Sequence, residues 1–164
     1  MPHIHSFAPV SDADARVLIL GSMPGNKSLE ENRYYAHPQN AFWKIMGELV
    51  GASPDFPYEE RLLLLKSSGI ALWDVLAACE RGKSSLDSDI RNESANDFES
   101  FFKGYPHITR VFLMAAKPGN ASKNSCWGKK NKRCRRLGFI ACPQPARPTP
   151  ERAMLKKCGN GGQL

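Results

Sequence analysis

Tyr35, His37 and Asn40 are residues whose types and close spacing could act on a ligand. The side-chain amide of Asn40 can orient a water molecule with its oxygen and donate a hydrogen bond with its nitrogen. The ring of Tyr35 offers a face on which a planar group can stack. His37 can bind a phosphate or a base, or it can hold its own loop. Tyr35 can equally be a core residue, and Asn40 can simply cap the helix that follows.

A buried strand and a tight turn precede this segment. The apolar run Val17–Leu20 has no polar interruption, which is typical of a strand buried on both faces in a parallel sheet. The residues that follow it are Gly21, Ser22, Met23, Pro24 and Gly25. Two glycines and a proline predict a tight turn at the carboxyl end of the strand, where open α/β sheets bind their ligands. The alternative is a turn that only ends the strand.

The sequence up to residue 112 alternates between helical and strand-like segments. We predict a helix from near Asn40 to Gly51, a helix over 58–67, a strand over 70–75, a helix capped by Asn96 and a strand over 108–112. A polar loop is expected from residue 76 to residue 91. Strands that alternate with helices imply a parallel, right-handed α/β sheet. Asp74, at the end of its strand, either faces the site or caps the next turn.

Several of these segments closely resemble the uracil-DNA glycosylase superfamily, and in particular its hypoxanthine-DNA (deoxyinosine) glycosylase branch. The strand followed by GSMPG is similar to the first superfamily motif, with Met23 where the mismatch-specific members carry asparagine. AHPQNAFW (36–43) is similar to a segment of those mismatch-specific members. Further similar segments are GIALWDVL (69–76), SLDSDI (85–90) and NDFESFF (96–102). The resemblance runs without a break over residues 5–112.

This resemblance implies a fold and an activity. The expected fold is one glycosylase-like domain over residues 1–164, a three-layer α/β/α sandwich with a central, mostly parallel four-stranded sheet. The expected activity is that of a monofunctional DNA glycosylase of base-excision repair, which flips a deaminated base out of DNA and hydrolyses its N-glycosidic bond. Hypoxanthine is the expected base, with uracil and xanthine left open. We expect a monomer that binds DNA containing deaminated bases, without a metal or another cofactor.

The resemblance also implies roles for individual residues. Asn40 matches the asparagine of the HPxNxFW pattern and is the expected catalytic amide, because Met23 replaces the usual first-motif asparagine. Tyr35 matches the aromatic residue that stacks on the flipped base. The turn from Gly21 to Gly25 is expected to bind the base edge through its backbone N–H groups. The residues expected to support the DNA or the loops are His37, Asp74, Pro143 and Pro145.

Charge is unevenly divided along the 164 residues, whose formal net charge is +7. Residues 1–112 hold 11 Lys and Arg against 15 Asp and Glu, whereas residues 113–164 hold 12 against one acid, Glu151. A basic segment predicts phosphate binding, although a solvated tail has the same composition. The five cysteines lack the C-x2-C spacing of metal sites. No apolar run is long enough to span a membrane, so we expect a cytoplasmic, nucleoid-associated protein with free thiols.

The segment after about residue 112 departs from the family pattern. The family has an Asn-Gly strand end, a helix and a fourth strand followed by a Ser-Pro-type loop. Codons possible for 114–118, read one nucleotide earlier, can encode Asn-Gly-Gly-Lys-Ala, and those for 141–148 can encode Leu-Pro-Ser-Thr-Ser-Pro-Ala. These two readings in one frame support the hypothesis that the chain is frame-shifted near Leu113. The basic tail over 113–164 would then not be natively folded, and the last helix and strand would be missing.

Two other classes of function fit the same sequence. One is a non-catalytic DNA- or nucleotide-binding domain whose basic tail dominates binding, with a steep salt dependence and no base release. The other is an inactive frame-shifted product. Release of a base from DNA distinguishes a glycosylase from both.

Overall fold

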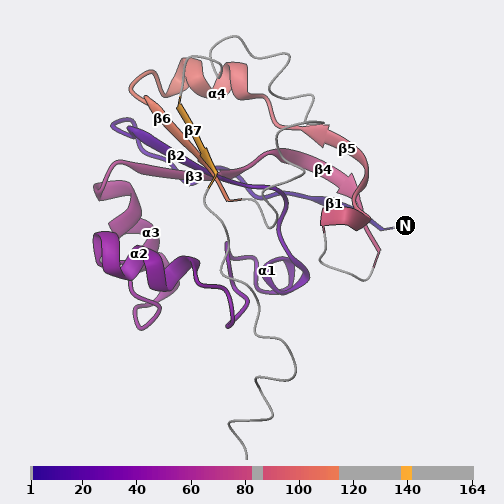
Figure 1. Ribbon diagram of the computed structural model, residues 1–164, viewed down its shortest axis with the longest axis horizontal. Helices are drawn as coiled ribbons and strands as arrows, with labels where there is room; N and C mark the ends of the chain where they lie inside the picture. Colours follow the sequence, from indigo (N-terminus) through magenta and orange to yellow (C-terminus); the bar gives the residue numbers. More distant parts are fainter. Residues whose placement is uncertain (1, 83–86, 115–137, 142–164) are drawn as a thin grey trace, which may run out of the picture.

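Two β-sheets of opposite type form the centre of the structure, a computed structural model that describes residues 2–82, 87–114 and 138–141 (Figure 1). Four strands run parallel in the order β3-β2-β6-β7: β2 (Val17–Gly21), β3 (Ile70–Asp74), β6 (Arg110–Leu113) and β7 (Gly138–Ala141). The predicted four-stranded parallel sheet is therefore confirmed. Its two uninterrupted apolar runs, in β2 and β3, lie next to each other and are buried, as their composition predicts.

The parallel sheet aligns the carboxyl ends of its strands at one edge. Gly21 at the end of β2 is the register partner of Asp74 at the end of β3. On the other side of β2, Leu20 pairs with Leu113 of β6. The turn after β2 and the side chain of Asp74 therefore lie at the same edge, which is the usual ligand edge of such sheets.

Helices cover both faces of the parallel sheet. α4 (Phe98–Gly104) lies on one face, and α2 (Phe42–Val50) and α3 (Tyr58–Ser67) lie on the other (Figure 1). The core under α4 contains Leu18, Leu20, Trp73, Phe98, Phe101, Phe102 and Val111. The core under α2 and α3 contains Ile19, Phe42, Trp43, Met46, Leu65 and Leu72. Alternate residues of each strand thus enter different cores, and the predicted α/β/α layering is confirmed.

The second sheet was not predicted. It contains β1 (His3–His5), β4 (Leu76–Glu80) and β5 (Arg91–Ala95) in the antiparallel order β1-β4-β5. The expected polar loop over 76–91 is therefore wrong at both ends. β4 forms because Leu76, Ala78 and Cys79 are buried, whereas β5 is exposed along its whole length and is held by its pairing with β4.

Two short helical segments were also missed. α1 (Asn26–Glu31) begins directly after the Gly21–Gly25 turn, and a single 3-10 turn, Asp87–Asp89, precedes β5. Both are too short for apolar residues to repeat along one helix face, which is the signal that predicts a helix from sequence.

The residue that caps α4 is Asp97 and not the predicted Asn96. The Asp97 carboxylate accepts a hydrogen bond from Ser100 N–H at 3.1 Å. Asn96 instead donates from Nδ2 to the backbone carbonyls of Asp74 and Leu76, at 2.9 and 3.1 Å. Asn96 therefore joins the end of β3 to the start of β4, so that its role concerns the two sheets and not the helix.

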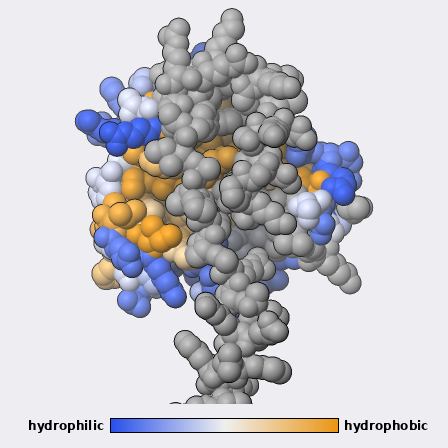
Figure 2. Space-filling model, viewed as in Figure 1, coloured by the Kyte–Doolittle hydropathy of each residue, from blue (hydrophilic) through white to orange (hydrophobic). Residues whose placement is uncertain are grey.

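The side of the molecule formed by α2 and α3 carries exposed apolar groups. The large apolar side chains exposed there are Leu49, Phe56 and Leu63, and Figure 2 shows hydrophobic surface in the region where Figure 1 places these helices. None of the described helices is long and apolar enough to cross a membrane.

Four residues of the basic tail, Gly138–Ala141, form β7 beside β6. The expectation that the last strand would be missing is therefore wrong. An edge strand needs little more than backbone pairing and residue types that favour the extended conformation, and Phe139 and Ile140 are of such types. Pro143 and Pro145 lie outside the described residues.

Candidate active site

Gly21, Asp74 and Tyr35 meet at the carboxyl edge of the parallel sheet. A Cβ atom on residue 21 would overlap the Asp74 carboxylate and would lie 3.3 Å from Tyr35 Oη. A residue without a side chain is therefore required here. This close approach brings the ends of β2 and β3 against the loop that follows α1.

Backbone hydrogen bonds fix the turn after β2 against the start of β4. Val75 N–H donates to the Gly21 carbonyl at 2.8 Å, and Leu76 N–H donates to the Ser22 carbonyl at 3.1 Å. The side chain of Met23 is 7% exposed and packs with Leu76 in a small core. The Met23 side chain is therefore a packing group.

Arg81 is a buried cation behind the turn, and sequence reasoning missed it. Its side chain is 1% exposed. Nη2 donates to the Pro24 carbonyl at 2.6 Å and to Asn26 Oδ1 at 3.3 Å. In the described part of the chain, Nε and Nη1 have no hydrogen-bond partner. The available signal was the position of Arg81 just beyond the apolar run 76–79, with Glu80 between them, where its long side chain can fold back over the neighbouring turn.

Asp74 is buried and is held through both its side chain and its backbone. Ser6 Oγ donates to Asp74 Oδ2 at 2.7 Å, and Asn96 Nδ2 donates to the Asp74 carbonyl at 2.9 Å. The carboxylate lies beside Gly21 and Tyr35. The carboxylate therefore lies at the end of β2, and whether it takes part in the site stays a prediction.

Tyr35 has a buried hydroxyl group and one covered ring face. Its ring stacks on Phe42 with the centroids 4.0 Å apart and the planes 19° apart. Its Oη has no hydrogen-bond partner among the described residues. Burial and, to a smaller extent, the Asp74 carboxylate raise the pKa of Tyr35 well above its ordinary value of 10.0. A phenol is already protonated at neutral pH, and this shift keeps Tyr35 protonated in alkaline solution as well.

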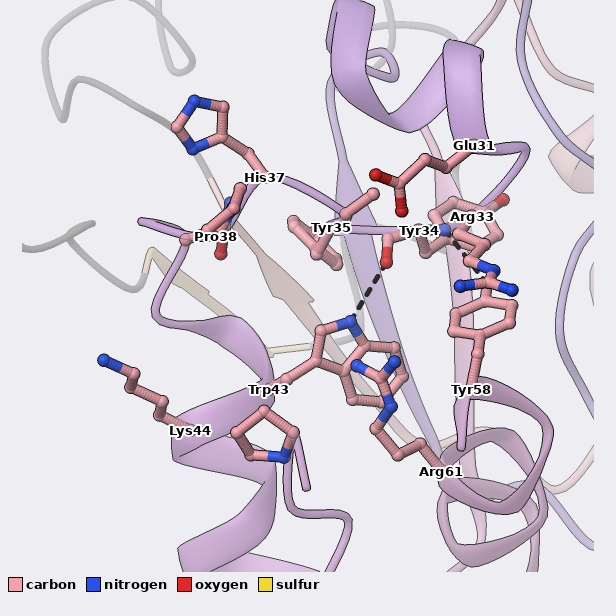
Figure 3. A pocket seen from close by; sticks show the side chains of 13 residues that line it. Glu31, Arg33, Tyr34, Tyr35, His37, Pro38, Trp43, Lys44, Tyr58 and Arg61 are labelled. Atoms are coloured by element: carbon pink, nitrogen blue, oxygen red, sulfur yellow. Dashed lines mark hydrogen bonds between the residues drawn. The ribbon is translucent and has the colours of Figure 1, made fainter. Parts of the chain in front are cut away.

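The backbone of Tyr35 is held in the left-handed conformation, with φ at 53°, which is uncommon for a residue with a side chain. The residue before it is fixed on both sides (Figure 3): Tyr34 N–H donates to Tyr58 Oη at 2.9 Å, and Trp43 Nε1–H donates to the Tyr34 carbonyl at 3.0 Å. Tyr34 Oη donates to the Ala8 carbonyl at 3.2 Å. These contacts from α2, α3 and the N-terminal segment hold the strained backbone and so fix the Tyr35 ring.

Asn40 precedes α2, but the prediction that it is the N-cap of this helix is wrong. The cap is Ala41, and Asn40 Oδ1 accepts a hydrogen bond from Phe42 N–H at 2.8 Å. This contact directs the amide oxygen to the start of the helix and leaves Nδ2 as the end that can donate to a ligand. The exposed His37 holds the same loop: its carbonyl accepts from Asn40 N–H at 2.8 Å, and its Nδ1 accepts from Gln39 N–H at 3.2 Å.

Tyr35, His37 and Asn40 line one pocket of about 130 Å³ (Figure 3). The cationic residues that also line it are Arg33, Lys44 and Arg61. The residues of the Gly21–Gly25 turn and Asp74 do not line this pocket. The predicted site residues therefore form two groups, and Tyr35 belongs to both, because it lines the pocket and its hydroxyl lies near Gly21.

Among the described residues, no group of three or more His, Cys, Asp or Glu side chains is placed to hold a metal ion. The groups that line the pocket are aromatic rings, an amide, an imidazole and cations. Such groups suit an organic ligand that is planar or carries negative charge.

The sequence matches the family model described as "Uracil DNA glycosylase superfamily" over residues 8–147. The chain belongs to the uracil DNA glycosylase superfamily. Two curated relatives, from Methanosarcina barkeri (strain Fusaro) and Methanosarcina acetivorans, are named hypoxanthine DNA glycosylase. Each is 37% identical over 114 residues, which is 69% of this chain and 72% of the relative.

A solved structure is similar to this superfamily member over most of its length. It is the solution NMR structure of a Methanosarcina acetivorans protein described as a candidate uracil DNA glycosylase. The two chains are 30% identical, and the TM-score is 0.70 with 87% of this chain and 84% of that chain covered. The fold is therefore that of the uracil DNA glycosylase superfamily.

Both groups of site residues lie inside the part of the chain that matches the superfamily. The matched residues 8–147 include the Gly21–Gly25 turn, the pocket loop from Tyr34 to Asn40, and Asp74. Within this uracil DNA glycosylase fold, a clamped aromatic ring and an oriented amide share one pocket. Such a pair can stack on a planar base and donate a hydrogen bond to its edge.

Proposed function

We propose that the chain is a monofunctional DNA glycosylase of base-excision repair that hydrolyses the N-glycosidic bond of hypoxanthine in DNA. The observation that carries the proposal is the 37% identity to two proteins named hypoxanthine DNA glycosylase. The pocket lined by Tyr35, His37 and Asn40 supports it, because it offers the groups that the reaction needs. We also propose that the protein acts as a monomer in the cytoplasm, on DNA of the nucleoid, and needs no cofactor.

In this proposal Tyr35 receives the flipped base. An enzyme reaches a base in duplex DNA only after the base has left the stack. Phe42 covers one face of the Tyr35 ring, so the base stacks on the other face. Stacking of a base on an aromatic side chain contributes about 1–3 kcal/mol. A phenol is neutral at about pH 7, and the raised pKa of Tyr35 keeps it neutral at higher pH as well, so the ring carries no negative charge that would oppose charge developing on the departing base.

Asn40 is the proposed catalytic residue. As the N-glycosidic bond breaks, negative charge develops on the departing base, and donors aimed at that base lower the barrier. Nδ2 of Asn40 is the proposed donor. Oδ1 already accepts from Phe42 N–H, and its second lone pair is free to orient the attacking water. The bond to Phe42 also means that the amide needs no reorientation when the substrate binds.

The turn after β2 is proposed to bind the edge of the base through the backbone N–H groups of Ser22 and Met23, with Gly25 allowing a close approach. Asp74 is proposed to support this turn and not to contact the base, since its carboxylate already accepts from Ser6 and abuts Gly21. His37 is proposed to hold the loop that carries Asn40, since its hydrogen bonds among the described residues are internal to that loop.

Base release from duplex DNA tests the proposal. Duplexes that contain deoxyinosine, deoxyuridine or deoxyxanthosine are compared for the chain, for Asn40→Ala and for the matched control Gln39→Ala on the same loop. We expect release of hypoxanthine, a loss of about 10²-fold or more in Asn40→Ala, and no change in Gln39→Ala. Release of uracil alone would reassign the base, and equal activity of Asn40→Ala would remove Asn40 from the mechanism.

The frame-shift hypothesis remains a prediction and needs one more protein in the same assay. This protein has the reading frame restored after Phe112, which replaces the basic tail by the family-like readings. If the restored protein alone releases hypoxanthine, the basic tail results from a frame shift that inactivates a glycosylase. If neither protein releases any deaminated base, the proposed function is wrong, and a non-catalytic DNA-binding domain becomes the better account.

A further inference from the structure

Arg33 and Arg61 share one aromatic platform at the pocket. The guanidinium carbon of Arg33 lies 5.5 Å from the centroid of the Tyr58 ring, and that of Arg61 lies 5.4 Å from the same centroid. Arg61 is also 4.6 Å from the centroid of the Trp43 ring. Figure 3 shows the two arginines beside these rings, on the side of the pocket formed by α2, α3 and the loop after α1. Cation–π contact fixes where the two cations lie.

These two cations have no carboxylate partner in the described part of the chain. Neither guanidinium forms an ion pair there, and Arg61 Nε is buried without a hydrogen-bond partner. Glu31 is the acidic residue that lines the pocket, and its carboxylate is 3.2 Å from Lys27 Nζ. The two arginines therefore contact the same ring without an ion-pair partner among the described residues, and Arg61 also keeps a buried donor without a partner there.

The electrostatics of the pair favour an anion. Burial lowers the pKa of Arg61, and the charge of Arg33 lowers it further. The surrounding residues 1–112 carry more acids than bases, yet Lys44 and His37 line the same pocket as the two arginines. An anion bound at this side of the pocket would relieve the repulsion between the two guanidinium groups. Arginine suits oxyanions of phosphate geometry because its donors form a planar fork.

We infer that Arg33 and Arg61 form a binding site for a phosphate group, and that this phosphate belongs to the backbone of the DNA strand whose base enters the adjacent pocket. The inference deepens the proposed function and rests on it for the identity of the ligand. The rings of Tyr58 and Trp43, which contact the cations, belong to residues that also fix the Tyr34 backbone. Tyr58 does so through Oη and Trp43 through Nε1. A phosphate on this platform is thus positioned relative to the Tyr35 ring by rigid contacts.

Binding to undamaged duplex DNA tests the site without requiring base release. Dissociation constants of the full chain are measured between about 0.05 and 0.2 M salt, where each lost phosphate contact reduces the salt slope by about one unit. The variants are Arg33→Gln and Arg61→Gln. The matched control is Arg110→Gln, an exposed arginine at the opposite edge of the sheet with the same change of charge. The control also corrects for binding through the basic tail.

We expect the slope to fall by about one unit in each of the two variants and to stay unchanged in the control. Arg33 is exposed, so Arg33→Gln remains informative even if Arg61→Gln loses its fold, which a thermal melt will show. Equal slopes in Arg33→Gln and Arg110→Gln would overturn the inference. Failure to release any base, with the slopes changed as expected, would instead overturn the proposed function and leave the phosphate site in place.

A second arm distinguishes DNA from a free phosphate compound. Inorganic phosphate is titrated into the protein while the Trp43 Nε1–H resonance is followed by NMR, and then into the complex with DNA. Two results together would support a site shared by phosphate and DNA. Millimolar phosphate should shift this resonance, and it should displace DNA from the wild type more readily than from Arg33→Gln. A tight phosphate complex that leaves DNA affinity unchanged would assign the site to a free phosphate compound and overturn the assignment to DNA.

Discussion

Gly21 and Asp74 are register partners at the ends of two parallel strands, and the Asp74 carboxylate fills the space that a Cβ atom on Gly21 would need. The contact joins the turn to the neighbouring strand end. Because Asp74 is buried and held by Ser6, it cannot move aside cheaply. We therefore expect Gly21→Ala to displace the turn that is proposed to bind the base edge.

Gly21→Ala should lower the free energy of unfolding by about 1–3 kcal/mol, the usual cost of overpacking. It should also reduce base release by more than the loss of folded protein alone would explain. Chemical denaturation and the deoxyinosine assay measure the two effects. The control is Gly104→Ala in α4, where an added Cβ meets no atom within 4 Å. A fully active Gly21→Ala protein would show that the turn does not need its present position.

Arg81 should act on the same turn from behind. Arg81→Met keeps the long apolar stem but removes the Nη2 contact to the Pro24 carbonyl. Two effects on stability oppose each other, since the variant also removes the buried Nε and Nη1 that have no partner among the described residues. We therefore expect a small change in melting temperature together with faster amide hydrogen exchange at Ser22 and Met23.

The control for Arg81→Met is Arg91→Met on β5, because Arg91 is exposed and bonds only its own local carbonyls in the described chain. Unchanged exchange at the turn in Arg81→Met would mean that the bonds from Val75 and Leu76 suffice to hold it. A collapse of the fold would instead make Arg81 a residue of general stability.

Tyr35 allows a test of pH dependence. Burial raises the pKa of Tyr35 in the folded protein above its unfolded value of 10.0, so the folded state holds the phenolic proton more tightly. The resulting stabilisation is complete below about pH 10 and is lost as the pH rises towards the folded pKa. Urea unfolding between about pH 8 and pH 11 should show a steeper loss of stability for the wild type than for Tyr35→Phe.

The same variant separates the ring of Tyr35 from its hydroxyl. Tyr35→Phe removes a buried hydroxyl that lacks a partner among the described residues, so we expect equal or greater stability at neutral pH and retained base release. Tyr35→Ala removes the stacking face and should reduce base release by 10-fold or more, on the scale of about 1–3 kcal/mol per stacked base. If Tyr35→Phe were inactive, the hydroxyl would be required for base release.

The parts of the fold that sequence predicts well are those whose signal is carried by contiguous residues. Val17–Leu20 forms β2 because an uninterrupted apolar run fits only a strand with two covered faces. Tyr58–Ser67 forms α3 with the predicted bounds, early acids and a late lysine. By contrast, β5 consists of exposed polar residues, and only its backbone pairing with β4 makes it a strand, which no local pattern reveals.

Within the site, sequence indicated the residues of the pocket loop but not the contacts that orient them. The types and close spacing of Tyr35, His37 and Asn40 indicated that they could act on a ligand, and the three residues line one pocket. Arg81 escaped notice because it lies far along the chain from the turn that it contacts, and Arg61 because its contact with Trp43 joins two different helices. The helix caps assigned to Asn40 and Asn96 were wrong because an asparagine near a helix start has several backbone partners within reach.

Asn40→Asp separates the structural role of Asn40 from its proposed catalytic role. A carboxylate oxygen can accept the Phe42 N–H as the amide Oδ1 does, and negative charge at the start of α2 suits the helix dipole. The aspartate nevertheless lacks the Nδ2 donor. We expect an unchanged or slightly higher melting temperature and a loss of base release of about 10²-fold or more. Asn40→Ala should instead lose activity and, with the hydrogen bond to Phe42 N–H, about 1 kcal/mol of stability.

The control for Asn40→Asp is Gln39→Glu, which adds the same charge on the exposed neighbouring residue and so measures electrostatic repulsion of DNA alone. Activity is compared at saturating DNA to separate weaker binding from slower bond cleavage. If Asn40→Asp released hypoxanthine as fast as Gln39→Glu, then Asn40 would only orient the start of α2. The donor for the departing base would have to be sought in the backbone of the Gly21–Gly25 turn.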